Sequence, residues 1–205
     1  SNKMAKKYAR ALVWLRRDFR LHDHPTLHEA LKNADEVFLT FVFDSKKTEE
    51  FLPGKKPFAS FFGALISFQK SLEEKGGSLI FLDGNATDEI PKLCKKLKIN
   101  ALYYGLDIEP ENLKRDTSVS KSLEALGIDT FAIKDHFLVA PDEVQNKSNL
   151  PYKVYTPFSK ACLEFISKNP IELLPTVQVS KLAPPQNEYS NDKTLKKITS
   201  LYEEG

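Results

Sequence analysis

The chain has 205 residues, of which 41% are apolar and 28% are charged, a composition typical of a globular protein. Its 30 basic and 28 acidic residues give a net charge of +2, so overall charge does not predict a nucleic-acid-binding surface. No apolar run approaches the roughly 20 residues that a membrane span requires. Two cysteines, Cys94 and Cys162, are too few for a disulfide framework. We therefore expect a cytoplasmic protein with reduced cysteines.

Five short apolar segments alternate with helical patterns along the first two thirds of the chain. The apolar segments are residues 11–15, 37–43, 78–82, 101–104 and 129–133. Continuous apolar runs of this length are typical of parallel strands that are covered on both faces. The pattern between them predicts helices at residues 25–32, 58–75, 87–97 and 110–126. This alternation predicts a doubly wound α/β domain over residues 8–135, with a five-stranded parallel sheet.

Residues 136–205 differ in character from that domain. They contain many prolines and one clear helical pattern, at residues 156–167, and they end in a polar tail. We interpret this segment as an extended linker whose tail has no core pattern.

A dense cluster of charge follows the first predicted strand. Ligands of open parallel sheets bind at the carboxyl ends of the strands, so Arg16, Arg17 and Asp18 are candidates for a ligand site. Arginine side chains there hold anions or carboxylates, and an aspartate can orient them. The alternative is a charged turn whose residues pair among themselves and with a neighbouring element.

Acidic residues occupy the matching places after two other strands. Asp44 follows the second strand, and Asp107, Glu109 and Glu111 follow the fourth strand and begin the next helix. At the crevice they would contact a polar ligand. Acidic residues at a helix N-terminus are also favoured by the helix dipole, so a capping role for these three, or a turn role for Asp44, stays open.

Other catalytic or metal-binding motifs are missing from the sequence. His22, His24 and His28 lie close together, but Pro25 begins the helix only after His24, and a helix N-terminus is a poor place for a cation. We therefore expect no metal site. The chain has no G-x-G-x-x-G, no phosphate-binding P-loop and no G-x-S-x-G, so it is not an obvious dehydrogenase, kinase or hydrolase.

Three motifs, in order along residues 11–165, together resemble the photolyase/cryptochrome family. The stretch VWLRRDFRLHDHPTL is similar to the family signature W-x-R-R-D-[LF]-R-x-x-D-x-x-x-L, which is matched by Trp14, Arg16, Arg17, Asp18, Arg20, Asp23 and Leu27. The stretch DIEPENLKRD resembles the family's D-x-E-P-x-x-x-x-R-D, which is matched by Asp107, Glu109, Pro110, Arg115 and Asp116. The stretch PYKVYTPFSKAC, residues 151–162, is similar to the motif just before the family's interdomain linker.

The resemblance implies a Rossmann-like domain that carries a light-harvesting antenna chromophore. In the family, a helical domain follows it and binds flavin adenine dinucleotide (FAD) and damaged DNA. The resemblance implies that the parent protein, with that domain, would be a deoxyribodipyrimidine photolyase, a carbon–carbon lyase that repairs cyclobutane pyrimidine dimers in light. Nothing in these 205 residues resembles the helical flavin domain. We therefore expect an antenna-domain fragment that is inactive in repair alone and whose partners are its own helical domain and, through the parent protein, DNA.

The resemblance also implies which residues contact the antenna, either methenyltetrahydrofolate or 8-hydroxy-5-deazaflavin. Folate-binding members share an Asn-Glu pair where this chain has Glu111 and Asn112 in reverse order, and deazaflavin-type members share Arg17, Asp107 and Glu109. With Asp44, the candidate antenna contacts are Arg17, Asp44, Asp107, Glu109, Glu111 and Asn112. The family-signature residues, which are candidates for interdomain contacts, are Trp14, Arg16, Asp18, Arg20 and Asp23. For Phe58, Phe61 and Phe62 we expect helix packing, with stacking on a chromophore as the alternative.

Two other functions fit the same residues. A cryptochrome-type blue-light sensor would have a similar N-terminal domain, and only the missing half or a repair assay would distinguish it. The third hypothesis is a free-standing nucleotide-binding α/β protein, such as a relative of the electron-transfer flavoproteins. The linker motif at residues 151–162 argues against it, because a free-standing domain needs no linker.

Overall fold

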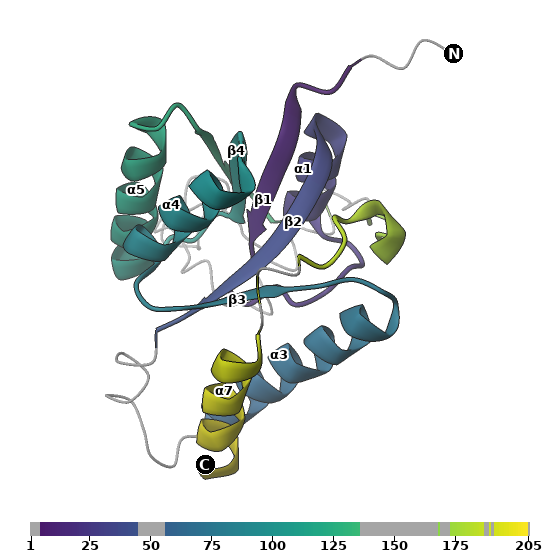
Figure 1. Ribbon diagram of the computed structural model, residues 1–205, viewed down its shortest axis with the longest axis vertical. Coiled ribbons are helices and arrows are strands. Elements are labelled where there is room, and N and C mark those ends of the chain that lie inside the picture. Colours follow the sequence, from purple (N-terminus) through teal and green to yellow (C-terminus); the bar gives the residue numbers. More distant parts are fainter. Residues whose placement is uncertain are drawn as a thin grey trace.

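A five-stranded parallel sheet lies at the centre of the described fold (Figure 1). The computed structural model describes residues 5–44, 56–135, 168, 173–186, 189 and 191–204. The strands lie in the order β3-β2-β1-β4-β5, and every neighbouring pair is parallel. Their bounds are β1 Tyr8–Trp14, β2 Ala34–Phe43, β3 Ile80–Asp83, β4 Ala101–Gly105 and β5 Asp129–Ile133. The predicted five-stranded parallel sheet is therefore confirmed.

Helices in the described part of the chain cover both faces of the sheet, as a doubly wound fold requires. The helices α1 (Pro25–Asn33) and α3 (Lys56–Glu74) contribute to the core on one face. The helices α4 (Ala86–Leu97) and α5 (Pro110–Glu124) contribute to the core on the other. Each begins close to the residue that the sequence indicated. Proline occupies the first turn of α1 and of α5, where its missing N–H costs no hydrogen bond.

The apolar strands supply both layers of the core. In β1, Ala11 and Val13 face α1 and α3, whereas Leu12 and Trp14 face α4 and α5. Both faces of the strand are buried, so its apolar residues run without a polar alternation. Cys94 of α4 is also buried, and burial raises the pKa of its thiol to about 12.

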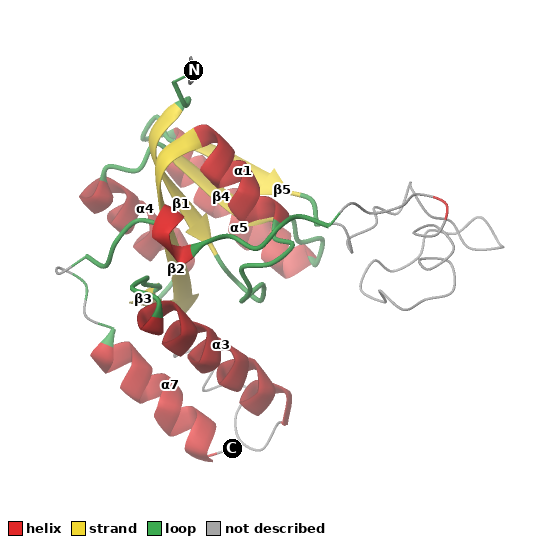
Figure 2. Ribbon diagram, turned by 90° about the vertical axis from the view of Figure 1, so that its right-hand side faces the viewer, coloured by secondary structure: helices red, strands yellow, loops and turns green. Residues whose placement is uncertain are grey.

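The described part of the C-terminal segment packs on this sheet, which corrects the expectation of a tail without a core pattern. Residues 192–204 form helix α7 (Asp192–Glu204), which lies beside α3 (Figure 2). Ile198 of α7 is 0% exposed, and Val177 and Leu182 join the same core layer. A short 3-10 helix, η1 (Val179–Lys181), lies between them along the chain. The helix predicted at residues 156–167 lies outside the described residues.

Helix α7 is held to the edge strand of the sheet by polar contacts of Asn191, just before the helix, and of Lys197 within it. The side chain of Asn191 accepts a hydrogen bond from the N–H of Phe81 at 2.9 Å and donates one to the carbonyl of Leu79 at 2.6 Å. Lys197 forms an ion pair with Asp83 at the end of β3. The two hydrogen bonds of Asn191 satisfy backbone groups that an edge strand otherwise leaves unpaired.

Candidate functional site

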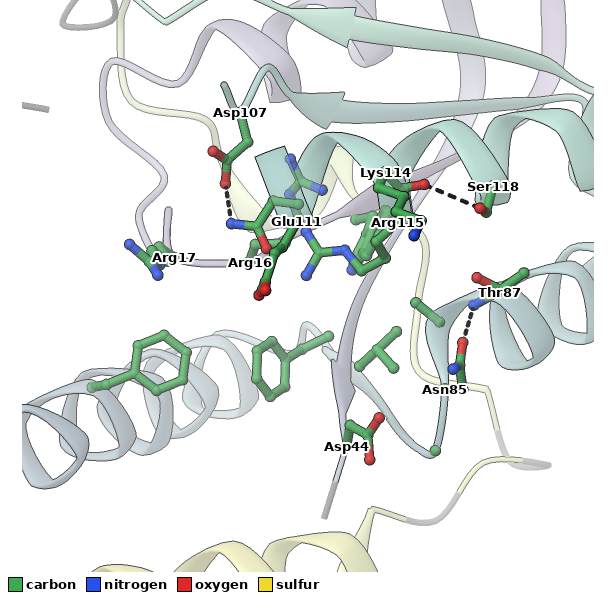
Figure 3. Close-up of a pocket in the computed structure, with 17 residues that line it drawn as sticks. Arg16, Arg17, Asp44, Asn85, Thr87, Asp107, Glu111, Lys114, Arg115 and Ser118 are labelled. Atoms are coloured by element: carbon green, nitrogen blue, oxygen red, sulfur yellow. Dashed lines mark hydrogen bonds between the residues drawn. The ribbon is translucent and has the colours of Figure 1, made fainter. Parts of the chain in front are cut away.

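A cavity of about 780 Å³ opens at the carboxyl ends of the strands (Figure 3). It lies near the ends of β1, β2 and β4, where the strand order changes direction and where ligands of doubly wound sheets bind. Three aromatic residues line it, Trp14, Phe41 and Phe61. Its polar lining residues are Arg16, Arg17, Asp44, Asn85, Thr87, Asp107, Glu111, Asn112, Lys114, Arg115 and Ser118.

Two arginines share one buried carboxylate in the wall of the cavity. Arg16 donates through Nη1 to Oδ1 of Asp116 at 2.8 Å, and Arg115 donates through Nε to the same oxygen at 3.1 Å. Arg16 also donates to the carbonyl of Gly105 at the end of β4. The guanidinium carbons of Arg16 and Arg115 lie 4.6 and 4.9 Å from the ring centre of Trp14. These contacts fasten α5 to the ends of β1 and β4.

Arg16, Arg115 and Asp116 form a cluster of two cations and one shared carboxylate. Burial lowers the pKa of Arg115 below its ordinary value, and the nearby Arg16 acts in the same direction, while Asp116 opposes them. The other oxygen of Asp116, Oδ2, is buried and has no hydrogen-bond partner among the described residues. Arg16 and Arg115 thus have one carboxylate between them, and the charge of Asp107, which also lines the cavity, stabilises the charged form of Arg115 as well.

Two more cations border the cavity without an ion-pair partner in the described part of the chain. Arg17, in the loop after β1, is exposed, and its guanidinium has no hydrogen bond or ion pair there. Lys114 is exposed on α5, and its ammonium group is likewise unpaired among the residues described. Figure 3 shows both side chains around the same hollow. They are available to bind an anion.

The acidic candidates after β4 divide into two groups. Asp107 accepts the backbone N–H of Glu109 at 2.9 Å and the side-chain amide of Asn112 at 2.8 Å, so it also shapes the turn into α5. Asp107, Glu111 and Asn112 all line the cavity, as does Asp44 after β2. Glu109 is the exposed N-cap residue of α5 and is not among the lining residues.

Asp18 and His24 close the loop between β1 and α1. Nε2 of His24 lies 2.8 Å from Oδ2 of Asp18, and Oδ1 of Asp18 accepts the N–H of Arg16 at 3.1 Å. Burial alone would raise the pKa of Asp18, but His24 and the backbone N–H groups of Arg16 and Asp18 outweigh it and lower the pKa to about 2. Asp18 is therefore a structural residue that fixes the path of the chain around Arg17.

The signature residues Arg20 and Asp23 hold the same loop to other parts of the fold. Arg20 donates to the carbonyl of Asp23 and to the carboxylate of Asp135, each at 2.9 Å. Asp23 exchanges two hydrogen bonds with the backbone of Leu174, one through its side chain at 3.0 Å and one through its N–H at 3.1 Å. His28 of α1 contacts the carbonyl of Pro175 at 2.8 Å. None of these residues lines the cavity.

The opposite wall of the cavity comes from a turn that the sequence did not single out. Asn85 is the N-cap of α4, and its side chain accepts the N–H of Thr87 at 2.8 Å. Both residues line the cavity, as do Lys114 and Ser118 of α5. Asn85 follows the third strand, so the carboxyl-end rule that selected Asp44 and Asp107 would have identified it.

The described residues show neither a metal-binding group nor a membrane-spanning helix. They contain no grouping of three His, Cys, Asp or Glu side chains that could hold a metal ion. No helix within the described ranges is long and apolar enough to cross a membrane.

Comparisons with known proteins agree with this architecture. The chain matches the family model described as DNA photolyase over residues 11–178. It is 33% identical over 153 residues to a deoxyribodipyrimidine photo-lyase of Alkalihalophilus pseudofirmus, a match that covers 73% of this chain and 32% of that protein. It is 28% identical over 183 residues to a cryptochrome DASH of a Synechocystis species, covering 86% of this chain and 36% of that protein.

Solved structures show the same fold. A bacterial class III photolyase from Agrobacterium tumefaciens matches with a TM-score of 0.69 at 22% identity, over 97% of this chain and 40% of that one. A Synechocystis cryptochrome matches with a TM-score of 0.65 at 25% identity, over 92% and 39%. The chain thus spans about a third of the length of the curated photolyase named above, 32%. It belongs to the DNA photolyase family and corresponds to the family's N-terminal α/β domain.

Proposed function

We propose that this chain is the antenna-binding domain of a DNA photolyase, and that the cavity holds the chromophore. The observation that carries the proposal is one cavity, at the ligand-binding edge of the sheet, whose walls combine aromatic rings with unpaired cations. An antenna chromophore is a flat conjugated ring system with an anionic tail. It absorbs light and passes the excitation to a flavin.

The residues of the cavity fit such a group. Its volume of about 780 Å³ lies within the range of roughly 300–1,000 Å³ that is usual for ligand pockets. Phe41 and Phe61 would contact the ring system, and Arg17 and Lys114 would bind the anionic tail. The carboxylate of Glu111, which is exposed and lines the cavity, would accept a ring N–H.

We propose further that the parent protein is a light-dependent carbon–carbon lyase that repairs cyclobutane pyrimidine dimers. Several relatives carry the name deoxyribodipyrimidine photo-lyase, and this chain matches about a third of one of them, 32%. FAD and damaged DNA would bind the helical domain that lies in the rest of such a protein. This chain alone would then be inactive in repair.

A cryptochrome-type blue-light sensor is the second candidate. The match to a cryptochrome DASH over 86% of this chain favours it. A repair assay on the parent protein separates the two functions, because a photolyase would restore dimer-containing DNA in light and a pure sensor would not.

A binding titration tests the proposed antenna site directly. The chain would be titrated with methenyltetrahydrofolate and with 8-hydroxy-5-deazaflavin while absorption and fluorescence are recorded. We expect saturable binding at one site, weakened about 3- to 10-fold by Arg17→Ala or Lys114→Ala, because each removes one cation from a partly desolvated ligand.

Lys121→Ala is the matched control for Lys114→Ala. Lys121 is exposed on the same helix, but it does not line the cavity, so its removal should leave the affinity unchanged. Absence of saturable binding of both ligands would contradict the proposal. An equal loss of affinity in the Lys121 control would show that only overall charge matters.

A further inference from the structure

We infer that Phe61 determines which chromophore the cavity accepts, because it presents a fixed aromatic surface to a fully flat ring. This inference rests on the proposed antenna function and deepens it. It predicts that the cavity prefers 8-hydroxy-5-deazaflavin, a fully conjugated flat tricycle. The ring system of methenyltetrahydrofolate carries saturated carbons and would make a poorer stack.

The position of Phe61 on α3 differs from those of its aromatic neighbours on the same helix. Phe61 is only partly buried and lines the cavity. Phe62 and Phe68 are 2% and 8% exposed and pack in the core without lining the cavity. Phe61 is therefore the α3 aromatic among the described side chains that a ligand can reach.

Three other rings hold Phe61 in place. Its ring centre lies 5.4 Å from that of Phe19, 5.5 Å from that of Phe62 and 6.0 Å from that of Phe41. All three pairs are tilted or T-shaped, with interplanar angles between 50° and 68°, so none of these three rings is stacked flat on Phe61. A side chain fixed in this way loses little conformational entropy when a ligand stacks on it.

Phe19 links this aromatic cluster to the cationic side of the cavity. It lies two residues after Arg17 in the loop that follows β1, and it also contacts Phe41 at 5.6 Å and Phe68 at 6.2 Å between ring centres. The loop that carries Arg17 is thus packed on the rings that hold Phe61. The separation between Phe61 and Arg17 is set by the fold, so a ligand must place a flat ring and an anionic group at matching positions.

Three variants separate stacking from general packing. Phe61→Leu keeps an apolar side chain but removes the ring, Phe61→Tyr keeps the ring, and Phe68→Leu removes a ring of the same helix that does not line the cavity. Dissociation constants for both chromophores would be measured for each variant, together with thermal unfolding to confirm the fold.

The wild-type chain should bind the deazaflavin several-fold more tightly than the folate. Phe61→Leu should weaken deazaflavin binding by roughly 5- to 10-fold and folate binding less, so that the preference falls. Phe61→Tyr should keep both affinities and the preference. Phe68→Leu should lower the unfolding temperature without changing the preference.

Three other results would contradict either the proposed antenna site or the role of Phe61. If the wild-type chain binds neither chromophore, the proposed function and this inference both fail. If the wild-type chain binds the folate as tightly as the deazaflavin, the inference about Phe61 fails, but the proposed antenna site is still supported. This result comes from the two wild-type affinities alone. If Phe68→Leu changes the affinity for each chromophore by the same factor as Phe61→Leu does, Phe61 is only a packing residue.

Discussion

The imidazole of His24 donates a hydrogen bond to the carboxylate of Asp18, with Nε2 and Oδ2 2.8 Å apart. The other ring nitrogen, Nδ1, accepts the backbone N–H of Leu27 at 3.1 Å, so the ring proton is on Nε2. One side chain therefore caps α1 and ties it to the end of β1. The Asp18–His24 pair thereby holds the loop that carries Arg17, and Arg17 lines the cavity.

The Asp18–His24 pair predicts a loss of stability in acid. The pKa of Asp18 is lowered from 3.8 to about 2 in the folded chain, so its contribution is complete above pH 3.8 and is lost as the pH falls toward about 2. That contribution is about 2 kcal/mol. Urea unfolding between pH 6 and 2 would measure this contribution. The free energy of unfolding should depend less on pH over this range in Asp18→Asn than in the wild type. A variant curve parallel to that of the wild type would refute the assignment.

Asp23 should couple the signature loop to the C-terminal segment. Its φ of +44° is costly for most side chains, and its carboxylate accepts the N–H of Leu174. Asp23→Ala should lower the free energy of unfolding by about 2 kcal/mol, because it loses the hydrogen bond and keeps the strained backbone. Asp23→Gly relieves the strain and should cost less, and Asp23→Asn should cost least. Equal losses in all three variants, measured by chemical denaturation, would contradict this account.

Asp116 should be the residue that holds α5 in place. It is 3% exposed and balances both Arg16 and Arg115, so Asp116→Asn leaves two guanidinium groups without their carboxylate. We expect a loss of about 3 kcal/mol in the free energy of unfolding and a change in Trp14 emission. Glu124→Gln, at an exposed position of the same helix, should change stability by less than about 0.5 kcal/mol. Similar losses in the two variants would argue against the ion-pair cluster.

Ile198 tests whether α7 is an integral part of the domain. Its side chain is 0% exposed against the α1 and α3 side of the sheet. Ile198→Ala should lower the free energy of unfolding by about 2–4 kcal/mol, and Ile198→Val by about 1 kcal/mol. If α7 does not pack on the domain, both variants will unfold like the wild type.

Sequence patterns predicted the sheet because its signal is local. An apolar run such as 101–104 identifies a buried strand by composition, and the helices between the runs imply parallel strands. Helix α7 was missed because few of its residues are apolar and its stability depends on a distant contact. Ile198 is buried by elements more than a hundred residues earlier in the chain, and Asn191 binds the β3 backbone.

The residues that line the cavity were predicted in part for a similar reason. Carboxyl-end logic placed Arg17, Asp44 and Asp107 at the ligand edge, and all three line the cavity. It left open whether Asp107 has a ligand-binding or a structural role, and the hydrogen bond to Glu109 shows that Asp107 also shapes the turn into α5. Lys114 lies one turn inside α5, so its contribution depends on the orientation of that helix, which the Asp116 cluster fixes.

Energy transfer from Trp14 would show whether the chromophore binds in the cavity. Trp14 is the only tryptophan of the chain, and it lines the cavity while being 2% exposed. Titration with 8-hydroxy-5-deazaflavin should quench Trp14 emission saturably, and excitation of the tryptophan should produce emission from the bound ligand. Unchanged Trp14 emission in the presence of bound ligand would place the chromophore elsewhere and contradict the account.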